Sequence, residues 1–182
     1  MTNVRAFQAT AVLCASLLLA SAPHAGAQDA GSGADASEFG TDLGGAWEGR
    51  GTVLRKITDE RPLNVKCEFD AVSEGAMIEL SGECGALFVK RQIRFALQQE
   101  AERVRGTYDA QLRTGEADLE GRYADGGLAL EIDWGAEVNG DKVAEMQIDR
   151  IDPSTLRIRV TDIEPQSGER VITSDLTLTK GG

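Results

Sequence analysis

The sequence lacks long hydrophobic runs, and its one apolar stretch, over residues 11–20, is too short to span a bilayer. Arg5 precedes this stretch, and the small residues Ala25 and Ala27 follow it at the spacing of a signal-peptidase site. The pattern is typical of a secretory signal peptide over residues 1–27. We therefore expect cleavage after Ala27 and export, and the composition favours a bacterial periplasm.

Histidine and cysteine are scarce. The single histidine, His24, and one of the three cysteines, Cys14, both lie within the expected signal peptide. The exported protein would then have no imidazole, and Cys67 and Cys84 would be its only thiols. Ser/His/Asp and Cys/His triads cannot be built from these residues, and a zinc site would need carboxylates alone. We therefore expect a protein that is not an enzyme and that holds no metal or cofactor.

The chain has 19 basic residues and 30 acidic ones, for a net charge of −11. Removal of Arg5 with the signal peptide would change the net charge to −12. A field of this sign repels phosphate backbones and anionic headgroups, so we expect no nucleic-acid partner and no membrane insertion. Residues 28–40 are rich in Gly, Ser, Ala and Asp and are typical of a flexible leader. The remaining residues, 41–182, are enough for one domain.

Apolar and charged side chains alternate with period two through most of residues 41–182, as in residues 63–71. One apolar and one charged face is typical of antiparallel strands with a single buried side. Turn sequences such as Asn139-Gly140 separate about ten such segments. The pattern predicts an all-β protein whose single antiparallel meander closes into a lipocalin-like β-barrel, with a sandwich as the alternative.

Residues 86–104 fit two structures. Leu97 and Val104 would lie on one stripe of an amphipathic helix. The alternation that begins at Val89 fits two strands joined within residues 98–102 instead. The strand-like flanks favour two strands, and the helix stays open as the alternative.

Cys67 and Cys84 predict the register of one hairpin. If they lie opposite each other, the turn falls at Gly75-Ala76, and a Gly-X pair is what a two-residue type II′ turn requires. The opposed pairs Phe69–Gly82 and Ala71–Leu80 then match apolar with apolar, and the cysteine Cα atoms would lie about 4.5 Å apart. We therefore expect a Cys67–Cys84 disulfide formed in an oxidising compartment, with a redox-active pair as the alternative.

Clustered carboxylates are abundant, and a carboxylate pair can hydrolyse glycosides. Strand parity, however, points Glu116, Asp118 and Glu120 outward, and Arg105 would lie opposite Glu120 in the hairpin. We interpret these residues as a solvated charge ladder. Calcium binding at Asp125-Gly126 or at residues 139–141 is a further hypothesis, but the full calcium-loop pattern is not found and both are turn sequences.

The inward face combines aromatic residues with many glycines and alanines. In a barrel this mixture leaves either a ligand cavity or a core filled by the aromatics, with glycines at close backbone approaches. Parity also points Arg91 inward, where it would hold a ligand carboxylate unless a bulge turns it out. The candidate cavity lining consists of Trp47, Phe69, Arg91, Tyr108, Tyr123 and Trp134.

Gly45-Ala46-Trp47 resembles the G-x-W motif that opens the first strand of lipocalins. Its continuation to Gly49 and Gly51 is similar to the opening of nitrobindin-like barrels. Both families are calycin-type antiparallel barrels, and the resemblance implies carriage of a small hydrophobic ligand. The second lipocalin motif, T-D-Y, is not found. The histidine through which nitrobindin-like barrels bind haem is also missing after cleavage, which excludes haem held in that way.

Together these features predict an exported, non-catalytic barrel that binds or carries a small, mainly hydrophobic molecule in its interior. The alternative is an envelope protein-interaction factor or a periplasmic protease inhibitor that acts through its surface or through residues 28–40. Small bacterial protease inhibitors, which resemble this chain in having a disulfide and a lipocalin-like barrel, act through an exposed N-terminal segment.

Overall fold

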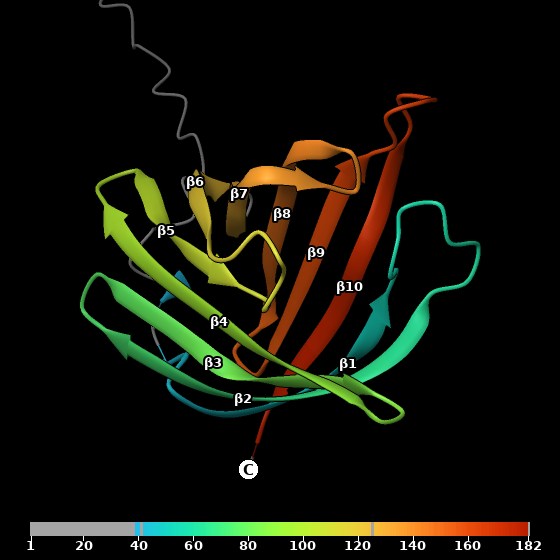
Figure 1. Cartoon of the computed structure of the whole chain (residues 1–182). Helices are drawn as coiled ribbons and strands as arrows, with labels where there is room; N and C mark the ends of the chain where they lie inside the picture. Colours follow the sequence, from blue (N-terminus) through green and yellow to red (C-terminus); the bar gives the residue numbers. More distant parts are fainter. Residues whose placement is uncertain (1–38, 41, 125, 182) are drawn as a thin grey trace, which may run out of the picture. The chain divides into compact units, whose positions relative to one another are not determined.

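The computed structural model describes residues 39–40, 42–124 and 126–181. Ten β-strands follow one another around a closed antiparallel barrel, and β1 pairs with β10 to complete the ring (Figure 1). The strands are β1 (Gly45–Val53), β2 (Leu63–Glu74), β3 (Met77–Ala86), β4 (Val89–Glu100), β5 (Arg103–Asp109), β6 (Ala117–Ala124), β7 (Gly127–Val138), β8 (Asp141–Asp152), β9 (Thr155–Ile163) and β10 (Arg170–Lys180). The predicted all-β meander that closes into a barrel is confirmed. No helix in the described part of the chain is long and apolar enough to cross a membrane.

Residues 86–104 form strands, as the alternation favoured, and not a helix. β4 extends to Glu100 and β5 begins at Arg103, so the turn is shorter than the predicted span of residues 98–102. Ala101 within this turn has a positive φ of 56°, which allows the tight reversal. Strands are favoured over the amphipathic helix because β4 and β5 each form hydrogen bonds with a neighbouring strand on both sides.

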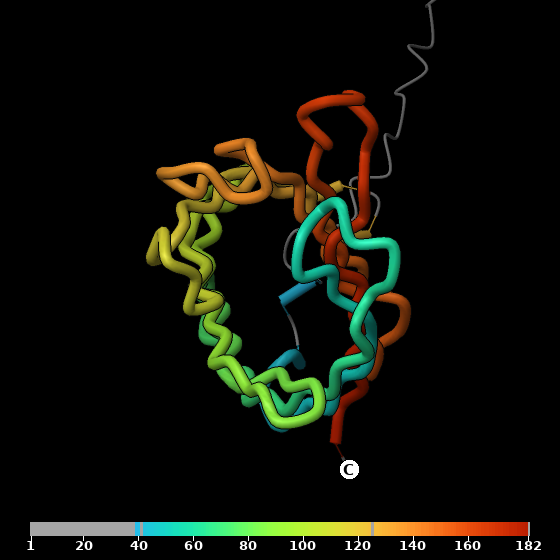
Figure 2. The backbone as a smooth tube through the Cα atoms, turned by 45° about the vertical axis from the view of Figure 1, so that its right-hand side comes forward, coloured from blue at the N-terminus to red at the C-terminus, as the bar shows by residue number. Residues whose placement is uncertain are grey.

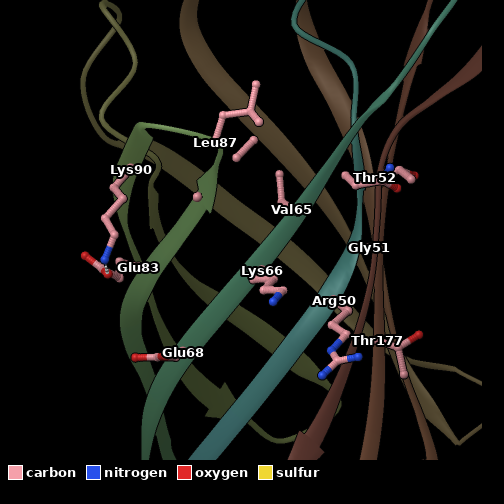
Figure 3. Close-up of a pocket in the computed structure, with 13 residues that line it drawn as sticks. Arg50, Gly51, Thr52, Val65, Lys66, Glu68, Glu83, Leu87, Lys90 and Thr177 are labelled. Atoms are coloured by element: carbon pink, nitrogen blue, oxygen red, sulfur yellow. Dashed lines mark hydrogen bonds and ion pairs between the residues drawn. The ribbon is translucent and has the colours of Figure 1, made fainter.

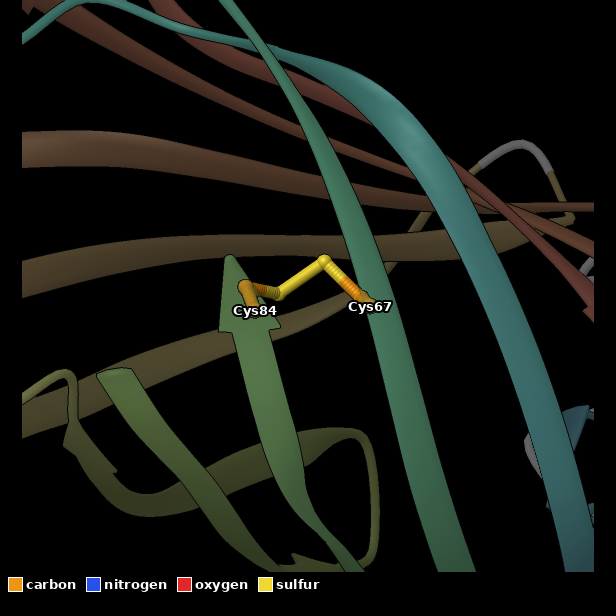
Figure 4. The surroundings of a disulfide bond; sticks show 2 residues. All are labelled: Cys67 and Cys84. Atoms are coloured by element: carbon orange, nitrogen blue, oxygen red, sulfur yellow. A yellow bond between two sulfur atoms is a disulfide. The ribbon is translucent and has the colours of Figure 1, made fainter. Parts of the chain in front are cut away.

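The β2–β3 hairpin has the register that the cysteines predicted. Cys67 pairs with Cys84, and Glu74 pairs with Met77 at the turn. Gly75 has φ +59°, the conformation that favours glycine at the first turn position. The Cys67–Cys84 disulfide is present, with the two Cα atoms 4.1 Å apart (Figure 4).

The charge ladder on the outside of the barrel also matches the strand parity. Glu116, Asp118 and Glu120 are exposed. Arg105 lies opposite Glu120 across β5 and β6, and Arg105 Nη2 is 3.4 Å from Glu120 Oε1. These carboxylates therefore face solvent from the outer wall.

Residues 39–40 and 42–44 close one end of the barrel, the end where β1 begins. Phe39 and Leu43 are buried in the core, and the Trp47 indole N–H donates a hydrogen bond of 2.8 Å to the Leu43 carbonyl. Arg150 donates a hydrogen bond of 2.9 Å to the Phe39 carbonyl. Figure 2 shows this blue segment within the ring of strands. We call this the closed end.

The burial of Phe39 corrects one boundary. Phe39 and Gly40 were assigned to the flexible leader, but the Gly40 carbonyl accepts a hydrogen bond of 2.6 Å from Ser73. Both residues therefore belong to the barrel. The rest of the expected leader and the expected signal peptide lie outside the described residues.

From the closed end to its middle, the barrel interior is a filled core. A hollow barrel would leave solvent-accessible surface on its inward side chains, yet those of the core are buried and several are less than 2% exposed. These fully buried side chains include Trp47, Leu119, Leu128, Ile132, Met146 and Leu178. The inward glycines reflect close backbone approach rather than space, because a Cβ on Gly106 would lie 2.0 Å from the Ala96 carbonyl oxygen.

Candidate ligand-binding site

The opposite end of the barrel, where β1 stops, differs from the closed end. Several inward apolar side chains there remain partly exposed above the filled core, from strands on all sides of the ring. We call this set the mouth; it consists of Val53, Cys84, Ala86, Ile93, Tyr108, Leu112, Val138 and Leu176. The mouths of β-barrels are frequent sites for small ligands, and accessible apolar side chains there favour a hydrophobic one.

Three aromatic rings in successive contact, of which two are stacked, form the floor of the mouth. The Phe95 and Tyr108 rings are nearly parallel, with centroids 4.6 Å apart. The Tyr108 and Trp134 centroids are 5.8 Å apart, with the rings tilted. Phe95 and Trp134 are each 5% exposed, so they lie where the filled core ends and the mouth begins.

The two tryptophans differ in how their indole N–H groups are satisfied. Trp47 at the closed end donates to the Leu43 carbonyl. The Trp134 Nε1 atom is buried and has no hydrogen-bond partner among the described residues. A buried donor without an acceptor costs about 1–3 kcal/mol, so the Trp134 indole N–H marks a position where a further acceptor would stabilise the protein.

A second polar feature lies in the wall at this end. Asp162 and Thr173 are the buried polar side chains of the described part of the chain, and Thr173 Oγ1 donates a hydrogen bond of 2.5 Å to Asp162 Oδ2. Asp162 Oδ1 is buried and has no hydrogen-bond partner there. Burial raises the pKa of Asp162, and the hydrogen bond from Thr173 opposes this shift.

Irregular strand pairing accompanies both polar features. The β7–β8 register shifts between Asp133 and Val138, next to Trp134, where Gly135 has φ +66°. The β9–β10 register shifts between Ile172 and Ser174, which places Thr173 at the irregularity. Bulges of this kind occur often beside functional sites, because they re-aim side chains.

The structure separates the six predicted lining residues. Tyr108 and Trp134 lie together at the mouth, and Phe69 is buried in the filled core. Trp47 and Tyr123 lie at the closed end, where the Tyr123 ring meets the Phe39 ring with centroids 6.0 Å apart.

Arg91 lies at the rim. It pairs with the inward-facing Cys84 but is exposed, and its guanidinium donates a hydrogen bond of 2.9 Å to the Gln111 carbonyl.

Asp162 and Thr173 were not among the predicted residues. A signal for Asp162 exists, because it continues the inward parity of Leu156, Ile158 and Val160. A carboxylate at an inward position is unusual enough to mark a site. Thr173 has no such signal, because the bulge that turns it inward cannot be read from alternation.

A surface pocket of about 820 Å³ lies in the barrel wall beside the mouth, with which it shares Ala86. Toward the mouth, the pairing of β2 with β3 ends at Lys66 and Gly85. The pairing of β3 with β4 continues beyond this point to Ala86 and Val89. The pocket therefore draws on both faces of the wall, with the buried Val65 and the outward Arg50 among its lining residues (Figure 3). None of the six predicted lining residues contributes to it.

Burial of the Tyr108 phenol gives a pH-dependent prediction. Although the residue is partly accessible, burial raises the pKa of Tyr108 from 10.0 to about 12. Between pH 10 and pH 12 this tyrosine ionises in the unfolded chain but not in the folded protein. Ionisation therefore stabilises the unfolded state, and the free energy of unfolding falls as the pH rises through this range. Tyr108→Phe is therefore expected to retain about 2 kcal/mol that the wild type loses over this range.

Urea unfolding below pH 10 and near pH 12 measures this difference. Tyr123→Phe is the matched control, because burial also raises the pKa of Tyr123 but only part of this side chain is buried. A smaller alkaline difference is expected for that variant. Identical pH dependence of wild type and Tyr108→Phe would contradict the burial of this phenol.

Comparisons with known proteins name no relative. No protein-family model matches the sequence, and no curated protein matches it. Within the described residues, no group of three or more His, Cys, Asp or Glu side chains is arranged to hold a metal ion.

Proposed function

We propose that this protein binds and carries a small, mainly hydrophobic molecule at the open end of its barrel. The ligand's apolar part rests against the mouth, above the Phe95, Tyr108 and Trp134 rings. A ligand oxygen accepts the hydrogen bond from Trp134 Nε1, which has no acceptor within the described chain. The unsatisfied indole N–H carries the proposal, because apolar surface alone would not set the ligand's orientation.

Two further features support this proposal. The filled core restricts the ligand to the mouth, so the molecule is small or leaves part of its surface in solvent. The G-x-W opening at Gly45 and Trp47 resembles that of lipocalins, which carry small hydrophobic ligands. Exported carriers need no catalytic group, in keeping with the lack of histidine expected after cleavage.

The two tryptophans allow a direct test with dodecanoate, whose carboxylate supplies an acceptor and whose chain is apolar. Trp47→Phe leaves Trp134 as the only tryptophan, and Trp134→Phe leaves Trp47. Dodecanoate is expected to shift the emission of the Trp47→Phe protein saturably. Emission from Trp47 at the closed end is expected to stay unchanged, because the core separates that residue from the mouth.

Affinity provides the second readout. Isothermal titration is expected to show binding of dodecanoate to the Trp134→Phe protein weakened roughly tenfold, because the ligand loses its donor. Trp47→Phe is the control and should bind as the wild type does. A saturable change in Trp47 emission, or equal affinity of the two variants, would contradict the proposed site.

A further inference from the structure

The tip of the β3–β4 hairpin exposes three consecutive apolar side chains. Leu87 and Phe88 form the two-residue turn and are 95% and 100% exposed, and Val89 is 65% exposed. We call residues 87–89 the tip. The other large exposed hydrophobic residues of the described chain are not adjacent to one another in sequence.

Turn geometry does not explain why the tip is apolar. Leu87 has φ +54°, a conformation that favours glycine or asparagine. A leucine there carries backbone strain that those residues would avoid, and it gains no burial in return. Strained residues of this kind occur most often at functional positions. An exposed apolar side chain at a strained turn position marks the tip as a candidate contact surface.

Behind the tip, the outer wall carries two rows of opposite charge, which the strand register places side by side. The row nearer the tip is basic and runs from β1 to β4 through Arg50, Lys66, Gly85 and Lys90. The row two residues farther from the tip is acidic and consists of Glu48, Glu68 and Glu83. Figure 3 shows Arg50, Lys66 and Lys90 with Glu68 and Glu83 on this wall.

The basic row is electrostatically unfavourable within the barrel itself. Arg50 and Lys66 lie directly opposite each other, and like charges at opposed positions destabilise a pair of strands. Neither forms an ion pair with another residue that the structure describes. Lys90 pairs with Glu83 and so tethers the nearest carboxylate. Arg50 and Lys66 are therefore available to an anionic partner.

We propose that the tip inserts into the surface of an anionic lipid bilayer, with the basic row against the headgroups. Apolar side chains flanked by Lys and Arg are the arrangement that interfacial membrane segments use. The acidic row lies about 7 Å farther from the tip, so the basic row is nearer to the headgroups that the tip would contact. This proposal departs from the expectation of no membrane insertion, which rested on net charge alone, because the surface beside the tip is locally basic.

This inference is independent of the proposed ligand, because it concerns the outside of the hairpin. A protein groove would match the apolar tip but would not require a row of cations behind it. The bilayer is therefore the partner that both features fit.

Vesicle flotation of the processed protein, with its N-terminus verified by mass, tests the inference without added ligand. Vesicles of equal parts phosphatidylglycerol and phosphatidylcholine are compared with pure phosphatidylcholine at physiological ionic strength. The protein is expected to float with the first and much less with the second. Phe88→Asp is expected to lower the partition coefficient at least tenfold, roughly the value of burying one large apolar side chain.

Ile151→Asp is the matched control. Ile151 is 61% exposed on β8, near the closed end, and its replacement should leave flotation unchanged. Arg50→Gln combined with Lys66→Gln should weaken binding to the anionic vesicles roughly tenfold, without affecting the tip. In a Phe88→Trp variant, the new indole should shift its emission to shorter wavelength on vesicle addition.

Several outcomes would overturn the inference. Wild-type protein that floats with neither vesicle overturns it, and would redirect the tip to a protein partner. Phe88→Asp that floats as the wild type does also overturns it, as does an equal loss for Ile151→Asp. Because dodecanoate binding is measured without vesicles, failure here leaves the ligand proposal intact, and the reverse also holds.

Discussion

Replacing Cys67 and Cys84 together by serine is expected to lower the free energy of unfolding by about 3 kcal/mol. The disulfide joins residues 17 positions apart, and it restricts that loop in the unfolded chain. Urea unfolding of the oxidised wild type and the double variant measures the difference. Wild type reduced with dithiothreitol is the control, because it loses the same cross-link without a change of residue.

The reduced wild type and the double serine variant should unfold at similar urea concentrations. Both should retain the barrel's far-ultraviolet spectrum at low urea, because the β2–β3 register is also set by Gly75 and by the flanking strands. Equal stability of oxidised and reduced protein would contradict a stabilising role for the bond.

Gly121→Ala is expected to destabilise the barrel by about 3 kcal/mol. A Cβ at this position would lie 2.0 Å from the Ala129 carbonyl oxygen and 2.8 Å from the Leu130 Cα. Both are backbone atoms of β7, so the contact can be relieved only by moving β6 away from its partner. Thermal unfolding followed by circular dichroism measures the loss.

Gly44→Ala is the matched control for this substitution. A Cβ on Gly44 would meet its nearest neighbour, the Ala71 carbonyl oxygen, at 3.8 Å, which is an ordinary contact. Gly44→Ala should therefore leave the melting temperature close to that of the wild type. A Gly121→Ala protein as stable as the Gly44→Ala protein would contradict the close approach of β6 and β7.

The sequence predicted the fold well because period-two alternation encodes which side of each strand is buried. The β2–β3 register was predictable pair by pair, because Gly75 and the two cysteines fix the same turn. The strands within residues 86–104 followed from parity. Strand length did not, since the turn at Ala101 is stabilised by pairing rather than by a turn sequence.

The candidate site was harder to predict, because parity says whether a residue points inward but not what fills the space beside it. Tyr123 and Trp134 share the same inward parity, yet one packs against Phe39 at the closed end and the other against Tyr108 at the mouth. Phe39 was hidden in a polar, glycine-rich stretch that composition alone assigns to a leader. Its burial depends on distant contacts, including one with Arg150.

Native mass spectrometry of the processed protein, purified from its own cells without detergent, tests ligand carriage most directly. We expect the mass of residues 28–182 less two hydrogens for the disulfide, together with a small molecule that is released on denaturation and extracts into organic solvent. A bare polypeptide mass, combined with Trp134 emission that does not respond to dodecanoate, would contradict the proposal that the mouth carries a ligand.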